Sequence, residues 1–415
     1  MTDTSAACAP AVPLVEPSDG VPPVVVTPVA LAAAASALAA GSGPVAVDAE
    51  RASGYRYGQR AYLVQLRRAG AGTVLIDPVA CPDLAIVRDA LVDTEWVLHA
   101  AGQDLPCLAE VGLRPRTLFD TELAARLLGH PRVGLATMVE TVLGLALEKG
   151  HAAVDWSTRP LPEPWLRYAA LDVEVLVDLR DALEERLREA GKLGWAREEF
   201  AAIATALPRE PPAEPWRRTS GVHRLRTRRQ LATVRALWEA RDALARDRDV
   251  APGRLLPDSA IIAAALAPAP ATPAALGSLP GFVGRAARAQ QRRWYAALRA
   301  AAALEESALP ALAARGADLP PPANRWADRD PAAAARLAAT RAVVAAIADE
   351  HTLPTENLLQ PDAVRRLAWS PPDELSPERV GDLLRGCGAR AWQVALTATA
   401  LAKALRRLEV RGVGG

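Results

Sequence analysis

The sequence is poor in aromatic side chains, in cysteine and in lysine, and each shortage narrows the possibilities. Aromatic residues make up 4% of 415 positions and hydrophobic residues 50%, so we expect a largely helical protein packed through small side chains. The four cysteines, Cys8, Cys81, Cys107 and Cys387, form no CxxC pair. Their spacing indicates neither a zinc site nor a disulfide framework and favours reduced thiols in a cytoplasmic protein.

The charge balance identifies no partner. The net charge is +1, and nearly all basic residues are arginine, which suits bidentate phosphate contacts but is equally typical of a GC-rich genome. The uncharged run from Val24 to Gly41 contains Pro28. We therefore expect a short strand at Val24–Val26 and a helix capped by Thr27 there, and no membrane anchor.

Composition and periodicity divide the chain into three structured parts. The predicted units are a disordered tail (1–21), an α/β domain (22–208), a Pro-rich linker (209–215), a helical domain (216–306), a second linker (307–324) and a second helical domain (325–412). The two helical blocks share an outline, each with a tryptophan at its start, a long helix and a Leu-Pro turn (Leu256-Pro257; Leu353-Pro354). We interpret them as a weak internal repeat.

The α/β domain is expected to hold a mixed sheet covered by helices, because strands come first and then alternate with helices. The predicted strands are 24–26, 45–50, 61–67, 73–77 and 96–98. The predicted helices after the one at Pro28 are 82–91, 104–111, 120–128, 134–143 and 164–190.

Two carboxylates end the predicted strand Val45–Glu50. The period of a strand is two, so Asp48 and Glu50 point to the same face. Buried carboxylates are costly unless a positive group neutralises them, and a divalent cation is the usual solution. The alternative is a strand that ends in a solvated turn.

Two further carboxylates are candidate ligands. Asp104 follows a strand that ends at His99 and stands where a helix begins, so helix capping is the favoured alternative to metal binding. Asp172 lies in an amphipathic helix that begins near Pro164, four residues after Tyr168, and the two stack on one face. The alternatives for Asp172 are a solvated helix face or a pair with an arginine.

In order and spacing, these three segments resemble the motifs of the DEDDy class of 3′→5′ exonucleases, and the chain is similar to the ribonuclease D family. Four other segments carry the same resemblance: Gln65-Leu66, Leu75–Pro78, Phe119–Thr121 and Asp155-Trp156 with Arg159–Leu161. The helical blocks resemble HRDC domains, the second as a divergent copy.

The resemblance implies a ribonuclease H-like α/β exonuclease domain with a mixed five-stranded sheet, followed by two all-α HRDC-like bundles. It implies four metal-binding carboxylates, Asp48, Glu50, Asp104 and Asp172, with Tyr168 in the place of the catalytic tyrosine. Like charges resist joint ionisation, and oxygen ligands favour two Mg²⁺ or Mn²⁺ ions. Two such ions about 4 Å apart would clamp the attacking and leaving oxygens, with Tyr168 holding the attacking water.

One competing pattern is rejected. His99 and Asp104 form H-x4-D, which resembles the third motif of the sister class with a catalytic histidine. No middle motif then lies between them and Asp48, and Tyr168 and Asp172 would be unexplained. We interpret His99 as a structural histidine.

The implied function is a metal-dependent 3′→5′ exoribonuclease that releases 5′-mononucleotides in tRNA and stable-RNA maturation. The alternatives are a DNA exonuclease in repair and a non-catalytic nucleic-acid-binding protein that acts through its HRDC domains. RNA with single-stranded 3′ ends, such as tRNA precursors, is the expected partner, DNA a further one, and a monomer that does not bind membranes the expected state. The candidate RNA contacts are Tyr55, Arg56, Tyr57, Arg159, Arg217, Arg218 and Arg224; an ordinary hairpin and a solvated helix start are the alternatives.

Overall fold

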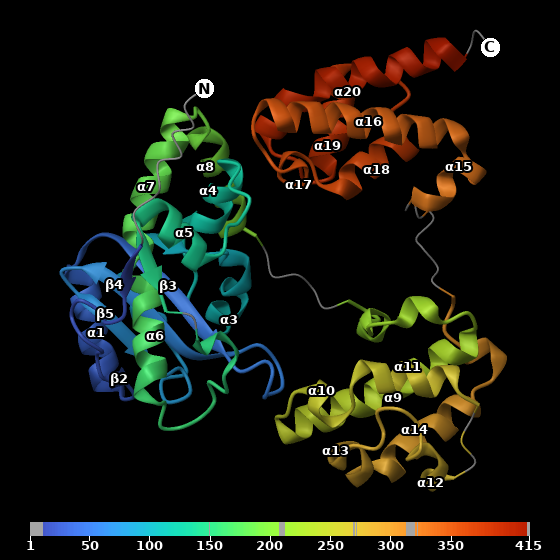
Figure 1. Cartoon of the computed structure of the whole chain (residues 1–415), viewed down its shortest axis with the longest axis horizontal. Coiled ribbons are helices and arrows are strands. Elements are labelled where there is room, and N and C mark those ends of the chain that lie inside the picture. Colours follow the sequence, from blue (N-terminus) through green and yellow to red (C-terminus); the bar gives the residue numbers. More distant parts are fainter. Residues whose placement is uncertain are drawn as a thin grey trace, which may run out of the picture.

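The computed structural model describes residues 11–148, 150–206, 212–268, 270, 272–312, 320–321 and 323–412. It contains an α/β domain, a first helical domain that extends from Pro215 to Leu309, and a second helical domain that begins at Ala323 (Figure 1). The first ten residues of the predicted tail, Cys8 among them, and parts of both predicted linkers lie outside the described residues.

A six-stranded mixed sheet forms the centre of the α/β domain. Its order is β2-β5-β4-β3-β6-β7, with β3, β4 and β5 antiparallel, β6 and β7 parallel to β3, and β2 parallel to β5. The strands are β2 (Val24–Val25), β3 (Ser42–Arg51), β4 (Ala61–Ala69), β5 (Gly72–Ile76), β6 (Glu95–Leu98) and β7 (Thr117–Asp120). The mixed sheet is confirmed, but the count of five was wrong. The missed strand is β7, which has only four residues and ends in an Asp that starts the next helix.

Residues 11–21 do not belong to a disordered tail. Strand β1 (Val12–Leu14) pairs in parallel with β8 (Leu145–Leu147), and Arg67 donates to the side chains of Ser18 and Asp19. The partners lie far away in the sequence, so the local Ala, Pro and Ser content gave no sign of them. The prediction is wrong for this part of the tail.

Helices cover both faces of the sheet. They are α1 (Pro28–Ala40), α2 (Ala85–Ala90), α3 (Leu105–Glu110), α4 (Thr121–Leu127), α5 (Leu135–Leu143), α6 (Glu163–Glu174), α7 (Leu176–Glu189) and α8 (Leu193–Ala204). The predicted cap is confirmed, because the Thr27 side chain accepts from Ala30 N at 3.2 Å. The predicted helix 164–190 is two helices with a break at Val175, and α8 was not predicted. Helix α6 packs on β3, β4 and β5 and so lies across the strand that contains Asp48 and Glu50 (Figure 1).

Each helical domain is built around one long helix. The first contains α9 (Arg228–Arg248), α10 (Pro252–Leu255), α11 (Asp258–Leu266), α12 (Pro273–Leu276), α13 (Arg285–Ala289) and α14 (Gln291–Ala302). The second contains α15 (Trp326–Arg329), α16 (Pro331–Glu350), α17 (Thr355–Leu358), α18 (Pro361–Trp369), α19 (Pro377–Gly386) and α20 (Ala391–Gly412).

The Leu-Pro pairs of the two helical blocks do not precede corresponding helices, contrary to the predicted shared outline. Pro354 precedes α17, which corresponds in order and length to α10, whereas Pro257 precedes α11. The Leu-Pro pairs therefore occupy different places. The entry tryptophans do correspond, since Trp216 and Trp326 are both buried before the long helix.

Among the described residues, one helix, α16, has the length and apolar composition of a membrane span. Its buried residues recur every three to four positions, at Ala333, Leu337, Thr340, Val344 and Ala348. Helices α18 and α20 pack on α16, so we interpret it as a bundle helix.

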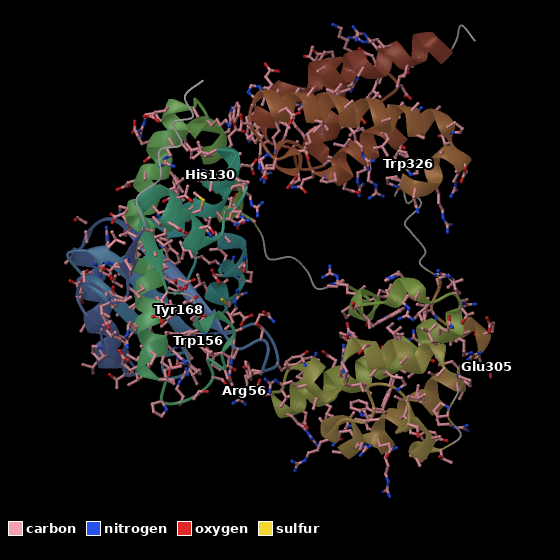
Figure 2. The ribbon with its side chains drawn as sticks, viewed as in Figure 1. Arg56, His130, Trp156, Tyr168, Glu305 and Trp326 are labelled. Carbon is pink, nitrogen blue, oxygen red and sulfur yellow. The ribbon has the colours of Figure 1, made fainter. Side chains whose placement is uncertain are left out.

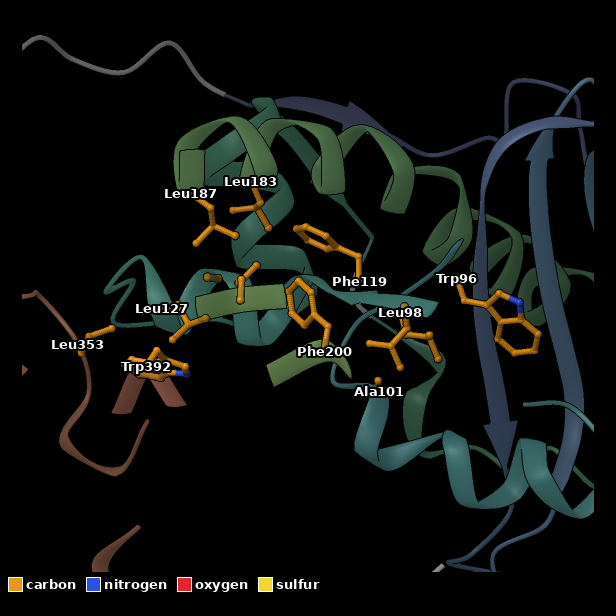
Figure 3. Packing of buried hydrophobic residues seen from close by; sticks show 14 of the residues in the cluster. Trp96, Leu98, Ala101, Phe119, Leu127, Leu183, Leu187, Phe200, Leu353 and Trp392 are labelled. Atoms are coloured by element: carbon orange, nitrogen blue, oxygen red, sulfur yellow. The ribbon is translucent and has the colours of Figure 1, made fainter. Parts of the chain in front are cut away.

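The second helical domain shares a core with the α/β domain. Trp195 of α8 stacks on Trp392 of α20 with ring centroids 4.9 Å apart, and Leu353 and Trp392 lie close to Leu127 (Figure 3). The Lys192 ammonium donates to the carbonyl oxygens of Leu127 at 2.7 Å and of His351 at 2.6 Å. This junction combines apolar packing with the hydrogen bonds of a buried Lys192.

Candidate active site

Three carboxylates converge where β3 meets α6. Asp48 and Glu50 alternate along β3 and so share one face, and Asp172 faces them from α6. One oxygen of each lies within 4.8 Å of an oxygen of the other two. Burial raises the pKa of Asp48, Glu50 and Asp172, and their mutual repulsion adds to the effect for Glu50 and Asp172. Such a group favours a cation.

Asp104 lies beside this group at the start of α3. It is buried, and its side chain makes no capping hydrogen bond, so the helix-capping alternative is wrong. Arg51 Nη2 lies 3.4 Å from Asp104 Oδ1. Burial, with the nearby Asp48, raises the pKa of Asp104 to about 8 despite Arg51. A carboxyl group whose ionised form is disfavoured in this way could hold a cation.

Tyr168 lies one helical turn before Asp172 and donates a hydrogen bond to it. Figure 2 shows Tyr168 on the helix that crosses the sheet. Burial first, and then the charges of Asp172 and Glu50, raise the pKa of Tyr168 far above its usual value. The hydroxyl therefore keeps its proton and can orient a neighbouring oxygen, as predicted for a positioning role.

Two buried polar residues that support the site were not singled out as site residues. Asp120 accepts from the backbone N–H of Ala100 at 3.0 Å and of Ala101 at 2.9 Å, which fixes the turn that leads to Asp104. Gln65 on β4 is fully buried and donates to Asp48 Oδ2 at 3.3 Å. The signal available in the sequence was a polar residue inside an apolar strand for Gln65 and an Asp before a helix for Asp120.

The domains match known families along most of the chain. Residues 23–188 match the family model described as 3′-5′ exonuclease, residues 230–298 the HRDC domain, and residues 319–405 the 3′ to 5′ exonuclease C-terminal domain. Ribonuclease D of Gluconacetobacter diazotrophicus is 33% identical over 339 residues, which are 80% of this chain and 82% of that protein. Ribonuclease D of Granulibacter bethesdensis is 31% identical over 332 residues, which are 78% of this chain and 80% of that protein. The chain belongs to the ribonuclease D family.

Solved structures agree with this assignment. A crystal structure of a protein from Bifidobacterium adolescentis superimposes with a TM-score of 0.86 at 38% identity, covering 95% of this chain and all of that one. The Escherichia coli RNase D structure gives a TM-score of 0.67 at 27% identity, covering 93% and 98%. The predicted family and enzyme class are confirmed, as is the α/β exonuclease domain followed by a helical HRDC region: the chain is a 3′→5′ exoribonuclease of the ribonuclease D family. The second helical block, expected to be a divergent HRDC copy, matches the 3′ to 5′ exonuclease C-terminal domain instead of the HRDC model.

His99 is a partly buried residue with a hydrogen-bond partner inside the protein. Its Nδ1 lies 2.8 Å from Thr121 Oγ1, and that hydroxyl donates to the Leu98 carbonyl at 3.2 Å, so we assign the hydrogen to Nδ1. Burial lowers the pKa of His99 to about 4. The ring is therefore neutral near neutral pH and ties β6 to α4.

Arg159 is not available to RNA in the way predicted. Its guanidinium makes a two-pronged contact with Asp77, at 2.6 Å and 2.9 Å. The remaining donors bind the carbonyl oxygens of Trp156, Thr158 and Tyr62. All five N–H donors of Arg159 therefore have acceptors within the protein. The prediction of a phosphate contact is corrected: Arg159 connects the loop before α6 to the sheet.

The predicted contacts at 55–57 also have partners within the protein. Tyr57 hydrogen-bonds to the HRDC domain, Arg56 donates to Ser157 Oγ at 2.7 Å, and the Arg254 guanidinium lies 4.0 Å from the centre of the Tyr55 ring. The loop therefore makes an interdomain contact that was not predicted, while 41% of the Arg56 side chain stays exposed. Contact of residues 55–57 with RNA stays a prediction.

The arginine cluster before α9 is divided. Arg217 binds Glu214 and stacks over Trp216 at 4.3 Å, so its predicted phosphate contact is likewise not supported. Arg218 and Arg224 are exposed, and within the described ranges neither side chain has a hydrogen-bond or ion-pair partner. Their contact with RNA stays a prediction.

Proposed function

We propose that this exoribonuclease removes nucleotides one at a time from single-stranded 3′ ends and releases 5′-mononucleotides, in the cytoplasm, as a monomer. Its substrates would be precursors of tRNA and other stable RNAs. The observation that carries the proposal is the convergence of Asp48, Glu50 and Asp172 within 4.8 Å, next to Asp104 and Tyr168. The Escherichia coli relative, described as an exoribonuclease involved in structured RNA processing, supports the choice of substrate.

The residues present fit divalent cations. All candidate ligand atoms are carboxylate oxygens, which suit Mg²⁺ or Mn²⁺ better than zinc, and burial makes their charges costly without a counter-ion. Asp48, Glu50, Asp104 and Asp172 would together hold two such ions. When bound, the ions supply neutralisation of the carboxylates, activation of the attacking water and stabilisation of the leaving 3′-oxygen.

The protein's own side chains orient the reaction. Tyr168 keeps its proton, so its hydroxyl can hold the attacking water in line with the scissile phosphate instead of taking a proton from it. Gln65 holds one oxygen of Asp48. Arg51 places a positive charge at Asp104, which offsets part of the repulsion among the carboxylates.

Binding of the RNA chain beyond the active site would come from the helical part. Arg218 and Arg224 offer exposed guanidinium groups suited to phosphates, and weak sites on a tethered domain raise the effective concentration of the 3′ end. A DNA exonuclease is the second candidate, since base stacking and phosphate contacts alone do not separate the two substrates.

The experiment that tests this function is a paired digestion. The purified chain receives Mg²⁺ or Mn²⁺ and 5′-labelled single-stranded RNA or DNA of the same sequence with a free 3′-OH, beside an EDTA control. We expect a ladder that shortens from the 3′ end of RNA, disappears with EDTA and is much weaker on DNA. Equal activity on DNA would support repair instead, and binding without cleavage of either would contradict the enzymatic role.

A further inference from the structure

The first helical domain, which carries the HRDC match, contacts the exonuclease domain through the loop that follows the catalytic strand. This loop comprises residues 52–60, between β3 and β4, and Arg56 lies at the end of the exonuclease domain nearest the HRDC domain (Figure 2). Backbone groups take part: Ala251 N donates to the Tyr55 carbonyl at 2.9 Å, and Arg254 Nε donates to the Gly54 carbonyl at 2.7 Å. The contact therefore includes directed hydrogen bonds to backbone carbonyl groups.

Tyr57 makes the largest share of these contacts. Its hydroxyl donates to Asp242 Oδ1 at 3.0 Å and accepts from Arg246 Nη2 at 3.1 Å. Its backbone N–H donates to Asp249 Oδ1 at 3.3 Å, and its ring packs against the core of the HRDC domain. The Tyr57 side chain thus binds Asp242 and Arg246 near the end of α9, and its backbone N–H binds Asp249, the residue that follows the helix.

The other end of the loop reaches the carboxylates. Arg51 directly precedes the loop, and its guanidinium donates to the Gln103 carbonyl at 2.9 Å besides facing Asp104. Between Arg51 and Tyr57 the chain forms a tight turn in which the backbone N–H groups of Tyr55 and Arg56 both donate to the Ala52 carbonyl at 2.8 Å. The segment that joins Arg51 to Tyr57 is therefore short and internally hydrogen-bonded.

The loop also holds the segment that leads to α6. Arg56 Nε donates to Ser157 Oγ, and the Tyr55 hydroxyl donates to the Ala153 carbonyl at 3.3 Å. Ser157 in turn donates to Asp155. The loop 52–60 is therefore connected to two segments of the active site. One leads to Asp104, and the other precedes α6, which contains Tyr168.

We propose that Tyr57 is a positioning residue for the exonuclease reaction, through which the HRDC domain holds the loop 52–60 and with it Arg51 at Asp104. The HRDC domain then contributes to the rate of cleavage as well as to RNA binding. This inference rests on the proposed exonuclease function. It differs from an RNA-binding role for the loop, because the Tyr57 hydroxyl already has both a donor and an acceptor within the protein.

The test compares two isoelectronic changes on α9 in the full chain. Asp242→Asn weakens the contact with the Tyr57 hydroxyl and leaves residues 51–60 and the carboxylates unaltered. Asp247→Asn is the matched control, because Asp247 is exposed and has no hydrogen-bond or ion-pair partner in the described part of the chain. Tyr57→Phe is the reciprocal variant, which keeps the ring in the HRDC core and removes the hydroxyl.

The first readout is cleavage of a trinucleotide, which is too short to depend on distant phosphate contacts. We expect Asp242→Asn and Tyr57→Phe to lower kcat by about tenfold with KM within about twofold, since small misplacement of catalytic groups costs rate. Asp247→Asn should match the wild type. A rise in KM at unchanged kcat, or equal behaviour of Asp242→Asn and Asp247→Asn, would overturn the inference.

The second readout, amide hydrogen exchange of residues 52–60, does not depend on activity. Exchange should be faster in Asp242→Asn and Tyr57→Phe than in the wild type and in Asp247→Asn. If the wild type cleaves no RNA while the exchange differs as expected, the proposed function fails and the interdomain tether stands. If the wild type cleaves RNA and the exchange is the same in all variants, the tether fails and the function stands.

Discussion

Two glycines of the exonuclease domain allow the junction with the C-terminal domain to be tested against an internal control. Gly129 follows α4 with φ +82°, and Gly191 follows α7 with φ +68°. Both helices end with the same pair of hydrogen bonds. The glycine N–H donates to the carbonyl three residues earlier, and the N–H of the next residue donates to the carbonyl five residues before it. The local cost of Gly→Ala should therefore be the same at both positions.

The two positions differ in what a methyl group would meet. A Cβ at Gly191 has nothing within 4 Å, whereas a Cβ at Gly129 lies 2.6 Å from both the carbonyl oxygen and the Cγ2 of Thr352 in the C-terminal domain. Ordinary contacts begin near 3.4 Å. The junction therefore has to open by nearly an ångström to accept Gly129→Ala.

The expected magnitudes follow from this difference. An alanine in the left-handed region costs about 1–2 kcal/mol, offset by about 0.4–1 kcal/mol from the less flexible unfolded chain, so Gly191→Ala should destabilise by about 1 kcal/mol. Gly129→Ala also lengthens the bonds from the Lys192 ammonium to the carbonyls of His351 and Thr352. Hydrogen bonds to a charged group contribute about 1.5–3 kcal/mol, which brings the expected loss to roughly 3–4 kcal/mol.

Native-state hydrogen exchange is the suitable assay, because a chain of several domains does not unfold in one step. The opening free energy of amides at residues 351–353 should fall by at least about 2 kcal/mol more in Gly129→Ala than in Gly191→Ala. Exchange in α9–α14 should not change in either variant. Equal losses in the two variants would refute the reasoning, since they would mean that the contact with Thr352 is not present in solution.

Three further predictions concern the active site and His99. Asp48→Asn should abolish turnover and leave RNA affinity, measured by filter binding, largely intact; retained turnover would contradict the metal assignment. Tyr168→Phe should lower kcat by about a hundredfold at similar KM, and a wild-type rate would exclude the positioning role of the hydroxyl. Because burial lowers the pKa of His99 from 6.5 to about 4, its contribution to stability is present above pH 6.5 and is lost as the pH falls towards 4. Between those limits the wild type should lose roughly 3 kcal/mol more than His99→Asn in the opening free energy of β6 and α4 amides, measured by native-state hydrogen exchange, and parallel pH profiles would show that the ring is not buried as a neutral group.

The carboxylates could be placed from the sequence because local geometry decides their direction. Alternation along β3 puts Asp48 and Glu50 on one face, and the helical period puts Tyr168 and Asp172 on one face, whatever surrounds them. Asp104 was harder, because an Asp before a helix is usually a cap. Only the family resemblance predicted a metal-binding role for it, and the structure shows a side chain without a capping bond.

The features that were missed depend on partners that are remote in the sequence. Strand β1 exists because of β8, and the break between α6 and α7 at Val175 interrupts an apolar period that continues on both sides. Arg159 and Tyr57 were predicted to contact RNA because an arginine and a tyrosine stand in loops next to the catalytic segments. Their partners, Asp77 and Asp242, lie 82 and 185 residues away, and no local pattern indicates such pairs.

The two helical domains are attached by interfaces of different physical character, and this difference bears on how the enzyme works. The C-terminal domain shares a continuous apolar core with the exonuclease domain, including the stacked Trp195 and Trp392, beside the ion pair of Arg390 with Glu199 at 3.4 Å. Screening of charges by salt does not weaken apolar burial. The HRDC domain is attached through Tyr57 and half-exposed charges such as the Arg56–Asp249 pair at 3.8 Å, which weaken as salt rises. Ionic strength should therefore loosen the HRDC contact before the C-terminal one. If the HRDC domain also positions the catalytic loop, salt will lower kcat on a trinucleotide at concentrations that leave the exchange of residues 351–353 unchanged.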